Sequence, residues 1–235
     1  MNEGHKPRLI FFDAAGTLFE VRGSVGDIYA GWAQRYGIEL EPAILQQRFV
    51  QAFRAQPPLA FGGYRSGAEL KQLEFAWWQH LVRQVFAEVD FPRFDEFFAA
   101  LFESFRHREA WRLYDDVLPT LAELQARGVR LAVLSNFDTR LEDLLADLGL
   151  ANYFAGVHLS SRIGAAKPDE RIFQAALQYH GLQRHEAWHV GDSWREDVEG
   201  AKGAGLRAWL IERDGRRPES LTCLDQLVEL IDQVS

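Results

Sequence analysis

Residues 8–18 read R-L-I-F-F-D-A-A-G-T-L, and this stretch decides the fold. The continuous apolar run at 9–12 is what a central parallel strand requires, because helices cover both faces of such a strand. Asp13 follows the run directly, and open α/β sheets bind their ligands outside the carboxyl ends of the strands. The alternative is that Asp13 only caps the turn that follows it. The rest of the chain decides between these two interpretations.

The composition indicates an ordinary globular protein. The chain has 235 residues, 47% of them hydrophobic, which allows one large domain or a core with a smaller domain. A net charge of -8 argues against nucleic-acid and basic membrane-surface binding. Residues 1–7 lack the apolar segment of a signal peptide, and no apolar run reaches the length of a membrane span. Cys223 is the single cysteine, so we expect a reducing, cytoplasmic location without disulfides.

Residues 19–110 show helical spacing of apolar residues and are rich in aromatic side chains. Pro42 and Pro92 are each placed to open a helix, and Ser66 with Glu69 forms a capping box. We expect the aromatic side chains to form the core of a helical bundle. Because this block interrupts the chain after the first strand, it is expected to be an inserted cap that excludes water and adds substrate contacts.

From residue 111 onward the pattern alternates between strands and helices. Strands are expected at 129–134, 157–159, 187–190 and 207–211, and helices at 116–128, 139–148, 169–180, 195–204 and 221–234. Such alternation predicts a parallel sheet with right-handed crossovers. The expected fold class is therefore α/β, with residues 1–18 and 111–235 forming a Rossmann-like, doubly wound parallel sheet. Residues 19–110 form the inserted all-helical cap, and the first strand lies at the centre of the sheet.

Polar side chains stand at or shortly after the ends of these strands, namely Asp13, Ser135, Lys167, Asp192 and Asp197. Each alone has a structural explanation, as a turn residue, a helix cap or a solvated charge. Helix capping does not explain the whole set. Two of the carboxylates supply hard oxygens for Mg²⁺, and the lysine and the metal would offset the charge of a phosphate. The first carboxylate could then attack phosphorus as a nucleophile, in a reaction that needs mainly positioning and charge neutralisation.

Four stretches resemble, in order and spacing, the four motifs of the haloacid dehalogenase-like (HAD) hydrolases. They are D-A-A-G-T-L (13–18), V-L-S-N-F-D (133–138), A-K-P-D (166–169) and V-G-D-S-W-R-E-D (190–197). The inserted helical block resembles the C1 cap of that family. The runs S-N-F-D-T-R-L-E (135–142) and H-V-G-D (189–192) resemble the branch known as rhythmically-expressed-gene-two-like hydrolases.

The resemblance implies a role for each matching residue. Asp13 would be the nucleophile, Ser135 the donor to a phosphate oxygen and Lys167 the charge clamp. The implied cofactor is Mg²⁺, and the implied partner is a small phosphorylated metabolite. The implied metal ligands are Asp13, the backbone carbonyl of Ala15, Asp192 and Asp197, and the implied phosphate-binding residues are Ala14, Gly16, Thr17 and Asn136.

Ala15 departs from the family pattern. Phosphatases of the family read D-x-D-G-T, and the second Asp is the general acid and base. A backbone carbonyl at position 15 can still bind a metal, but a methyl group cannot protonate a leaving alkoxide or activate water. The loss of one positioned acid or base costs about 10²- to 10⁴-fold in rate. The loss should matter most for poor leaving groups, so aryl and acyl phosphates should suffer less.

Several functions remain compatible with this departure. One is a phosphatase for activated phosphates, or one whose acid comes from the cap, where Glu20 and Asp27 are candidates that are better explained as surface or capping carboxylates. A second is phosphonatase-like chemistry, which would need a cap lysine for a Schiff base. Lys71 is the single lysine between residues 19 and 110, and its helix position favours solvent exposure.

Two further alternatives use no acid. A dehalogenase attacks carbon and needs no metal, and the two carboxylates Asp192 and Asp197 argue against it. A binding or regulatory protein would keep the phosphate and Mg²⁺ site and dispense with turnover, and Ala15 argues for it. His189 is expected to be a core histidine. The oligomeric state is expected to be a monomer or a homodimer.

Overall fold

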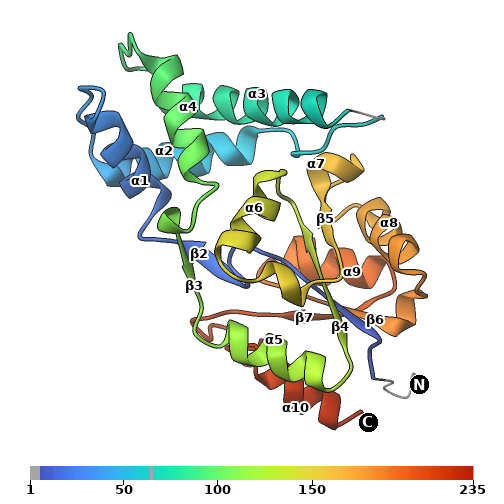
Figure 1. The fold of residues 1–235 in the computed structure, drawn as a ribbon. Coiled ribbons are helices and arrows are strands. Elements are labelled where there is room, and N and C mark those ends of the chain that lie inside the picture. The colour runs from blue at the N-terminus through green and yellow to red at the C-terminus, as the bar shows by residue number, and fades with distance from the viewer. Residues whose placement is uncertain (1–5, 64–65, 235) are drawn as a thin grey trace.

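The computed structural model describes residues 6–63 and 66–234 and contains a five-stranded sheet in the order β5-β4-β1-β6-β7 (Figure 1). All neighbouring strands in it are parallel. Its strands are β1 (Leu9–Phe12), β4 (Arg130–Ser135), β5 (Val157–Leu159), β6 (Ala187–Gly191) and β7 (Arg207–Leu210). The expected α/β fold with the first strand at its centre is confirmed.

β1 is buried on both faces, and its side chains alternate between two cores. Ile10 and Phe12 belong to the hydrophobic cluster that also holds residues of helices α5, α6 and α10. Leu9 and Phe11 belong to the cluster on the other face, with residues of α8 and α9. Helices therefore cover both faces of the sheet, which is why the strand needs an unbroken apolar run. The bounds of these helices are α5 (Val117–Ala126), α6 (Arg140–Asp147), α8 (Glu170–His180), α9 (Gly200–Gly203) and α10 (Gln226–Asp232).

The four α-helices described between β1 and residue 111 pack around a third cluster that is rich in aromatic side chains and lies above the sheet in Figure 1. They are α1 (Val25–Gln34), α2 (Pro42–Ala55), α3 (Gly67–Val85) and α4 (Phe94–Ser104). The capping boxes that begin α1 and α3 use Ser24 with Asp27 and Ser66 with Glu69. We refer to these helices and their connections as the cap, and the division at residues 18 and 111 remains a prediction.

The block 19–110 is not entirely helical, which corrects the expectation. Its first residues form β2 (Phe19–Val21), which pairs antiparallel with β3 (Trp111–Leu113). This two-stranded ribbon joins the cap to the sheet (Figure 1). Three-residue strands carry too few side chains to show a period, so pairing between the two ends of the insertion determines them.

Two helices near the carboxyl end also differ from expectation. The segment expected to be one helix at 195–204 is a π-helical turn, η4 (Trp194–Glu199), followed by α9. The helix expected from residue 221 begins at Gln226, because Leu221 forms a bridge with Ile211 beside the sheet. The remaining short elements are η1 (Arg108–Ala110), η2 (Ala151–Tyr153), α7 (Ser160–Ile163) and η3 (Arg184–Glu186). Among the residues described, none of the helices combines the length and apolar character needed to cross a membrane.

Candidate active site

The site is built around Asp13, which directly follows β1 and is 7% exposed. Its backbone amide donates to the carbonyl of Val190, so the carboxyl ends of β1 and β6 are held side by side. The Nζ of Lys167 donates to Asp13 Oδ1 at 2.6 Å and also to Asp197. Burial disfavours the charged ammonium, but the charges of Asp13 and Asp197 outweigh it and raise the pKa of Lys167 above its usual value. The lysine is therefore charged and fixed between two carboxylates.

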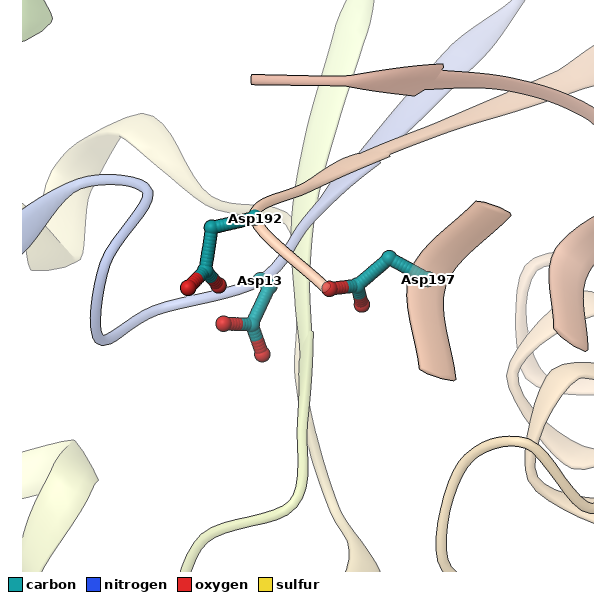
Figure 2. Close-up of side chains that lie close together, drawn as sticks. All are labelled: Asp13, Asp192 and Asp197. Carbon is teal, nitrogen blue, oxygen red and sulfur yellow. The ribbon is translucent and has the colours of Figure 1, made fainter. Parts of the chain in front are cut away.

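Three carboxylates meet at this edge of the sheet, as Figure 2 shows. Oxygens of Asp13, Asp192 and Asp197 all lie within 4.8 Å of one another. Although Asp192 as a residue is exposed, desolvation of its carboxyl group, with the charges of Asp13 and Asp197, raises its pKa to about 8. Burial also raises the pKa of Asp13, and Lys167 lowers it only in part. One lysine does not neutralise three carboxylates, so the group fits a divalent cation held by oxygen ligands.

Both carboxylate oxygens of Asp197 form hydrogen bonds with protein donors. Its Oδ1 accepts from Lys167 and lies 2.8 Å from His189 Nε2, and its Oδ2 accepts from the amide of Ser193. Burial lowers the pKa of His189, so the neutral ring donates through Nε2. Burial raises the pKa of Asp197, but Lys167 and His189 outweigh this effect and hold it below its usual range. Asp197 thus orients the lysine, and Asp13 and Asp192 are freer to take a metal.

Glycine is required at two positions that bring the carboxylates together. Gly16 has φ +88°, and a Cβ there would lie 2.4 Å from an oxygen of Asp192. A Cβ at Gly191 would lie 2.1 Å from the Cγ of Asp197. The chain after β1 and the last residue of β6 can approach these carboxylates only because both positions lack a side chain.

Ser135 ends β4 beside Asp13 and is 3% exposed. Hydrogen bonding by its side chain is one of the effects that lower the pKa of Asp13. Asn136 is already occupied: its Nδ2 donates to the carbonyl of Lys167 at 3.0 Å and to Glu196 at 2.9 Å, and its Oδ1 accepts from the amide of Lys167. The structure therefore places Asn136 as a brace for the lysine. Sequence reasoning missed Glu196, whose helical position gives no sign of its contact with Asn136.

The turn after β1 is closed by its own backbone. The amides of Thr17 and Leu18 donate to the carbonyl of Ala14, and the amide of Gly16 donates to the carbonyl of Phe19 at 2.7 Å. The amide of Gly16, implied by the resemblance to flank a phosphate, is thus engaged within the turn. Thr17 is fully buried, and its hydroxyl has no partner among the described residues. The side chain of Ala15 is a half-buried methyl group that can move no proton.

The two cap carboxylates considered as substitute acids have other partners, and the cap lysine faces solvent. The guanidinium of Arg112 and the hydroxyl of Tyr114 both donate hydrogen bonds to the carboxylate of Glu20. These hydrogen bonds hold the pKa of Glu20 below its usual value. Asp27 caps α1, as expected. Lys71 is exposed on α3, which agrees with the expectation of a solvent-facing lysine.

An open pocket of about 590 Å³ lies between the cap and the core near this site. The cap contributes Pro57, Pro58 and Ala60, and the core contributes residues including Lys167. Lys167, which also bonds Asp13, is the residue that this pocket and the carboxylate group have in common.

Comparison with known proteins places the chain in a class. A family model for haloacid dehalogenase-like hydrolases matches residues 7–205, and the chain belongs to this family. The Homo sapiens haloacid dehalogenase-like hydrolase domain-containing protein 3 is 38% identical over 211 residues, covering 87% of this chain and 81% of that protein. The Drosophila melanogaster rhythmically expressed gene 2 protein is 27% identical over 216 residues, 87% of this chain and 82% of that protein. A phosphoserine phosphatase of Thermus thermophilus is 42% identical over 116 residues, 49% of this chain and 46% of its own.

Solved structures agree on the fold. The L-2-haloacid dehalogenase of Xanthobacter autotrophicus has a TM-score of 0.73 at 18% identity, over 97% of this chain and 100% of that one. The HAD-hydrolase YfnB of Bacillus subtilis, described as bound to magnesium, has a TM-score of 0.68 at 18% identity, over 97% of this chain and 99% of that one. At these identities the likeness shows the shared architecture of sheet and helical cap.

Proposed function

We propose that this hydrolase is a Mg²⁺-dependent phosphatase that acts on a small phosphorylated metabolite through an aspartyl-phosphate on Asp13. The observation that carries the proposal is the meeting of three carboxylates around the end of β1 with one buried lysine. A hydrolase that attacks carbon without a metal has no use for the second free carboxylate, Asp192, beside Asp13. The half-chain similarity to a phosphoserine phosphatase also supports phosphate as the group transferred.

The chain's own residues would perform the transfer. A carboxylate oxygen of Asp13 forms a bond to phosphorus while the bond from phosphorus to the leaving oxygen breaks. Lys167 binds Asp13 Oδ1 and offsets the charge of the phosphoryl group. Ser135 donates a hydrogen bond to a phosphate oxygen, and Asp197 with Asn136 keeps the lysine in position. Water then attacks the acyl-phosphate and releases phosphate and the free carboxylate.

Mg²⁺ would be held by Asp13, Asp192 and the carbonyl of Ala15, and when bound it neutralises negative charge beside the phosphoryl group. The raised pKa values of Asp13 and Asp192 support this ligand set, because both carboxylates would be better stabilised with a cation between them.

The methyl group of Ala15 determines which substrates are suitable. The leaving oxygen receives no proton from residue 15, and Glu20 and Asp27 are bound to other partners. We therefore propose a preference for aryl or acyl phosphates, whose leaving groups need no proton. A phosphonatase is disfavoured because Lys71 is exposed. A phosphate- and Mg²⁺-binding protein with little turnover remains the second candidate, and Ala15 is the observation that favours it.

The decisive experiment measures hydrolysis of an aryl, an acyl and an alkyl phosphate with Mg²⁺ and with chelator. Metal-dependent turnover of the first two, lost in Asp13→Asn and kept in the control Asp95→Asn, is the expected result. Asp95 is a suitable control because it forms an exposed ion pair with Arg83 within the cap. Full activity of Asp13→Asn would contradict the assignment of Asp13 as the nucleophile. Binding of phosphate and Mg²⁺ without turnover of any substrate would support the second candidate, a binding protein.

A cytoplasmic location, a monomeric or homodimeric state and the lack of a nucleic-acid or membrane partner belong to the same proposal. The net charge of -8 supports the lack of a nucleic-acid partner, and the single cysteine supports the location.

A further inference from the structure

Cap helix α3 buries an acidic side chain against the core. Glu74 is 1% exposed, although it lies in a helix of the cap. Its Oε1 accepts from the amide of Thr139 at 3.0 Å and from the hydroxyl of Ser161 at 2.7 Å, and its Oε2 accepts from the hydroxyl of Thr139. Both core residues lie beyond the sheet edge that carries the site, since Thr139 follows β4 and Ser161 follows β5.

Glu74 supplies a hydrogen-bond acceptor for the backbone amide of Thr139 at the beginning of α6. Thr139 is the N-cap residue of α6, and its own side chain makes no capping bond. A carboxylate is favourable beside the unpaired amides at the beginning of a helix. Burial raises the pKa of Glu74, while the bonds from Thr139 and Ser161 lower it. Glu74 therefore accepts from the amide and the hydroxyl of the N-cap residue Thr139, while Asp138 of the core accepts from the amide of Arg140.

Neighbouring contacts tie the same segment to the cap. Trp78, one turn further along α3, donates from Nε1 to Asp138 Oδ2 at 2.7 Å. Asp138 is fully buried and forms an ion pair with Arg140, whose Nη1 donates to the carbonyl of Phe102 in α4 at 2.8 Å. Figure 1 shows α3 and α4 lying above α6 and α7, where these contacts are made. Two cap helices thus hold the three consecutive residues 138–140.

We propose that Glu74 is a positioning residue: it fixes the segment from Ser135 to Thr139 against the cap and thereby keeps Ser135 and Asn136 in place at the site. The inference deepens the proposed function and rests on it, because that function assigns Ser135 to the phosphate. The segment between the two ends is short: β4 ends at Ser135, and α6 begins at Arg140. We therefore expect a displacement of Thr139 to shift Ser135, the phosphate donor, and Asn136, which braces Lys167.

The test compares Glu74→Gln with the wild-type protein by hydrogen–deuterium exchange and by kinetics. The amide keeps one acceptor oxygen and replaces the other with an NH2 donor, so it cannot reproduce the acceptor contacts of both carboxylate oxygens, and exchange in residues 135–141 should become roughly tenfold faster or more. With an aryl phosphate and Mg²⁺, kcat should fall on the order of 10- to 100-fold, as expected when a contacting group is misplaced. Thr139→Val, which removes the hydroxyl and keeps the amide, should show the same changes to a smaller degree.

A double-mutant cycle separates positioning from general stability. In the Ser135→Ala background, Glu74→Gln should lower kcat several-fold less than it does in the wild-type background, because one of the two residues that it positions has already lost its functional group. An equal loss in both backgrounds would overturn the proposal, as would unchanged exchange and unchanged kcat in Glu74→Gln. Glu88→Gln is the matched control, since Glu88 forms an exposed ion pair with Arg48 within the cap. If the wild-type protein hydrolyses none of the phosphates, the proposed function fails, and the exchange of residues 135–141 alone decides whether Glu74 holds the segment.

Discussion

Ala15 is the residue whose replacement should change the chemistry most. Ala15→Asp places a carboxyl group after Asp13 where the family's general acid stands, so alkyl phosphate turnover should rise by about 10²- to 10⁴-fold. The kcat/KM of aryl phosphates should change far less. The measurement is kcat/KM for an alkyl and an aryl phosphate in both proteins, because this ratio does not include the later hydrolysis of the aspartyl-phosphate, a step that both substrates share. The double variant Asp13→Asn, Ala15→Asp should be inactive, and equal gains on both substrates would contradict a role in leaving-group protonation.

Asp192 is expected to link metal binding to stability. Its pKa is raised to about 8 in the folded protein from a usual 3.8, so the folded state binds more protons between these values. Without metal, the protein should therefore gain stability as the pH falls from about 8, and Asp192→Asn should remove part of this dependence.

Excess Mg²⁺ should stabilise the wild-type protein more than the Asp192→Asn variant. A ligand that binds only the folded state raises the melting temperature. Mg²⁺ should thus raise the melting temperature of the wild-type protein at pH 8 and have little effect on Asp192→Asn. Thermal unfolding with Mg²⁺ and with chelator measures both effects, and an equal Mg²⁺ response in the two proteins would place the metal elsewhere.

At the scale of elements, two histidines connect edge strand β5 to α8. Their Nε2 atoms lie 2.9 Å apart, and His158 is 7% exposed. Burial, His180 and Arg162 lower the pKa of His158 to about 4 from 6.5. The unfolded chain therefore binds the proton first, and stability should be lost as the pH falls from about 6.5 towards 4.

The loss should amount to about 2 kcal/mol, and His158→Gln should reduce it. The measurement is the free energy of unfolding by urea at pH 7 and pH 5. His80→Gln is the matched control because His80 is exposed on α3. The same pH dependence in His158→Gln as in the wild-type protein would assign the effect to other groups.

The sequence predicts elements well where their own residues carry the pattern. The run at 9–12 is apolar because both faces of β1 are covered, and α3 begins at the capping box that Ser66 and Glu69 predict. The sequence does not predict β2, because this strand forms only by pairing with β3, about ninety positions later in the chain. The late start of α10 has the same origin, since the bridge between Ile211 and Leu221 takes residues that have helical spacing.

The candidate site divides in the same way. Asp13, Ser135 and Asp192 are predictable because they follow apolar strands whose carboxyl ends meet at one edge. Glu74 and Glu196 are not, because each is a polar residue in a helical segment whose partner lies about sixty positions away. Nothing in the local spacing distinguishes such a carboxylate from a solvated one.

At the scale of the whole molecule, the cap and the sheet share apolar contacts. Ile28 and Phe105 pack against both the cap cluster and the cluster on one face of the sheet. With the contacts of residues 138–140, this continuity predicts that cap and core unfold together. Calorimetry should show one transition whose van't Hoff and calorimetric enthalpies agree. Two resolved transitions would mean that the cap is an independent cooperative unit.

The insertion of the cap after β1 also affects biosynthesis. Leu9 pairs with Arg130 on one side and Ala187 on the other, so the central strand leaves the ribosome long before either neighbour exists. During that interval Leu9–Phe12 is an unpaired apolar strand, which is the kind of segment that aggregates and that chaperones bind. The cap helices make local contacts and can form meanwhile, so assembly of the nucleophile strand into the sheet waits for the second half of translation.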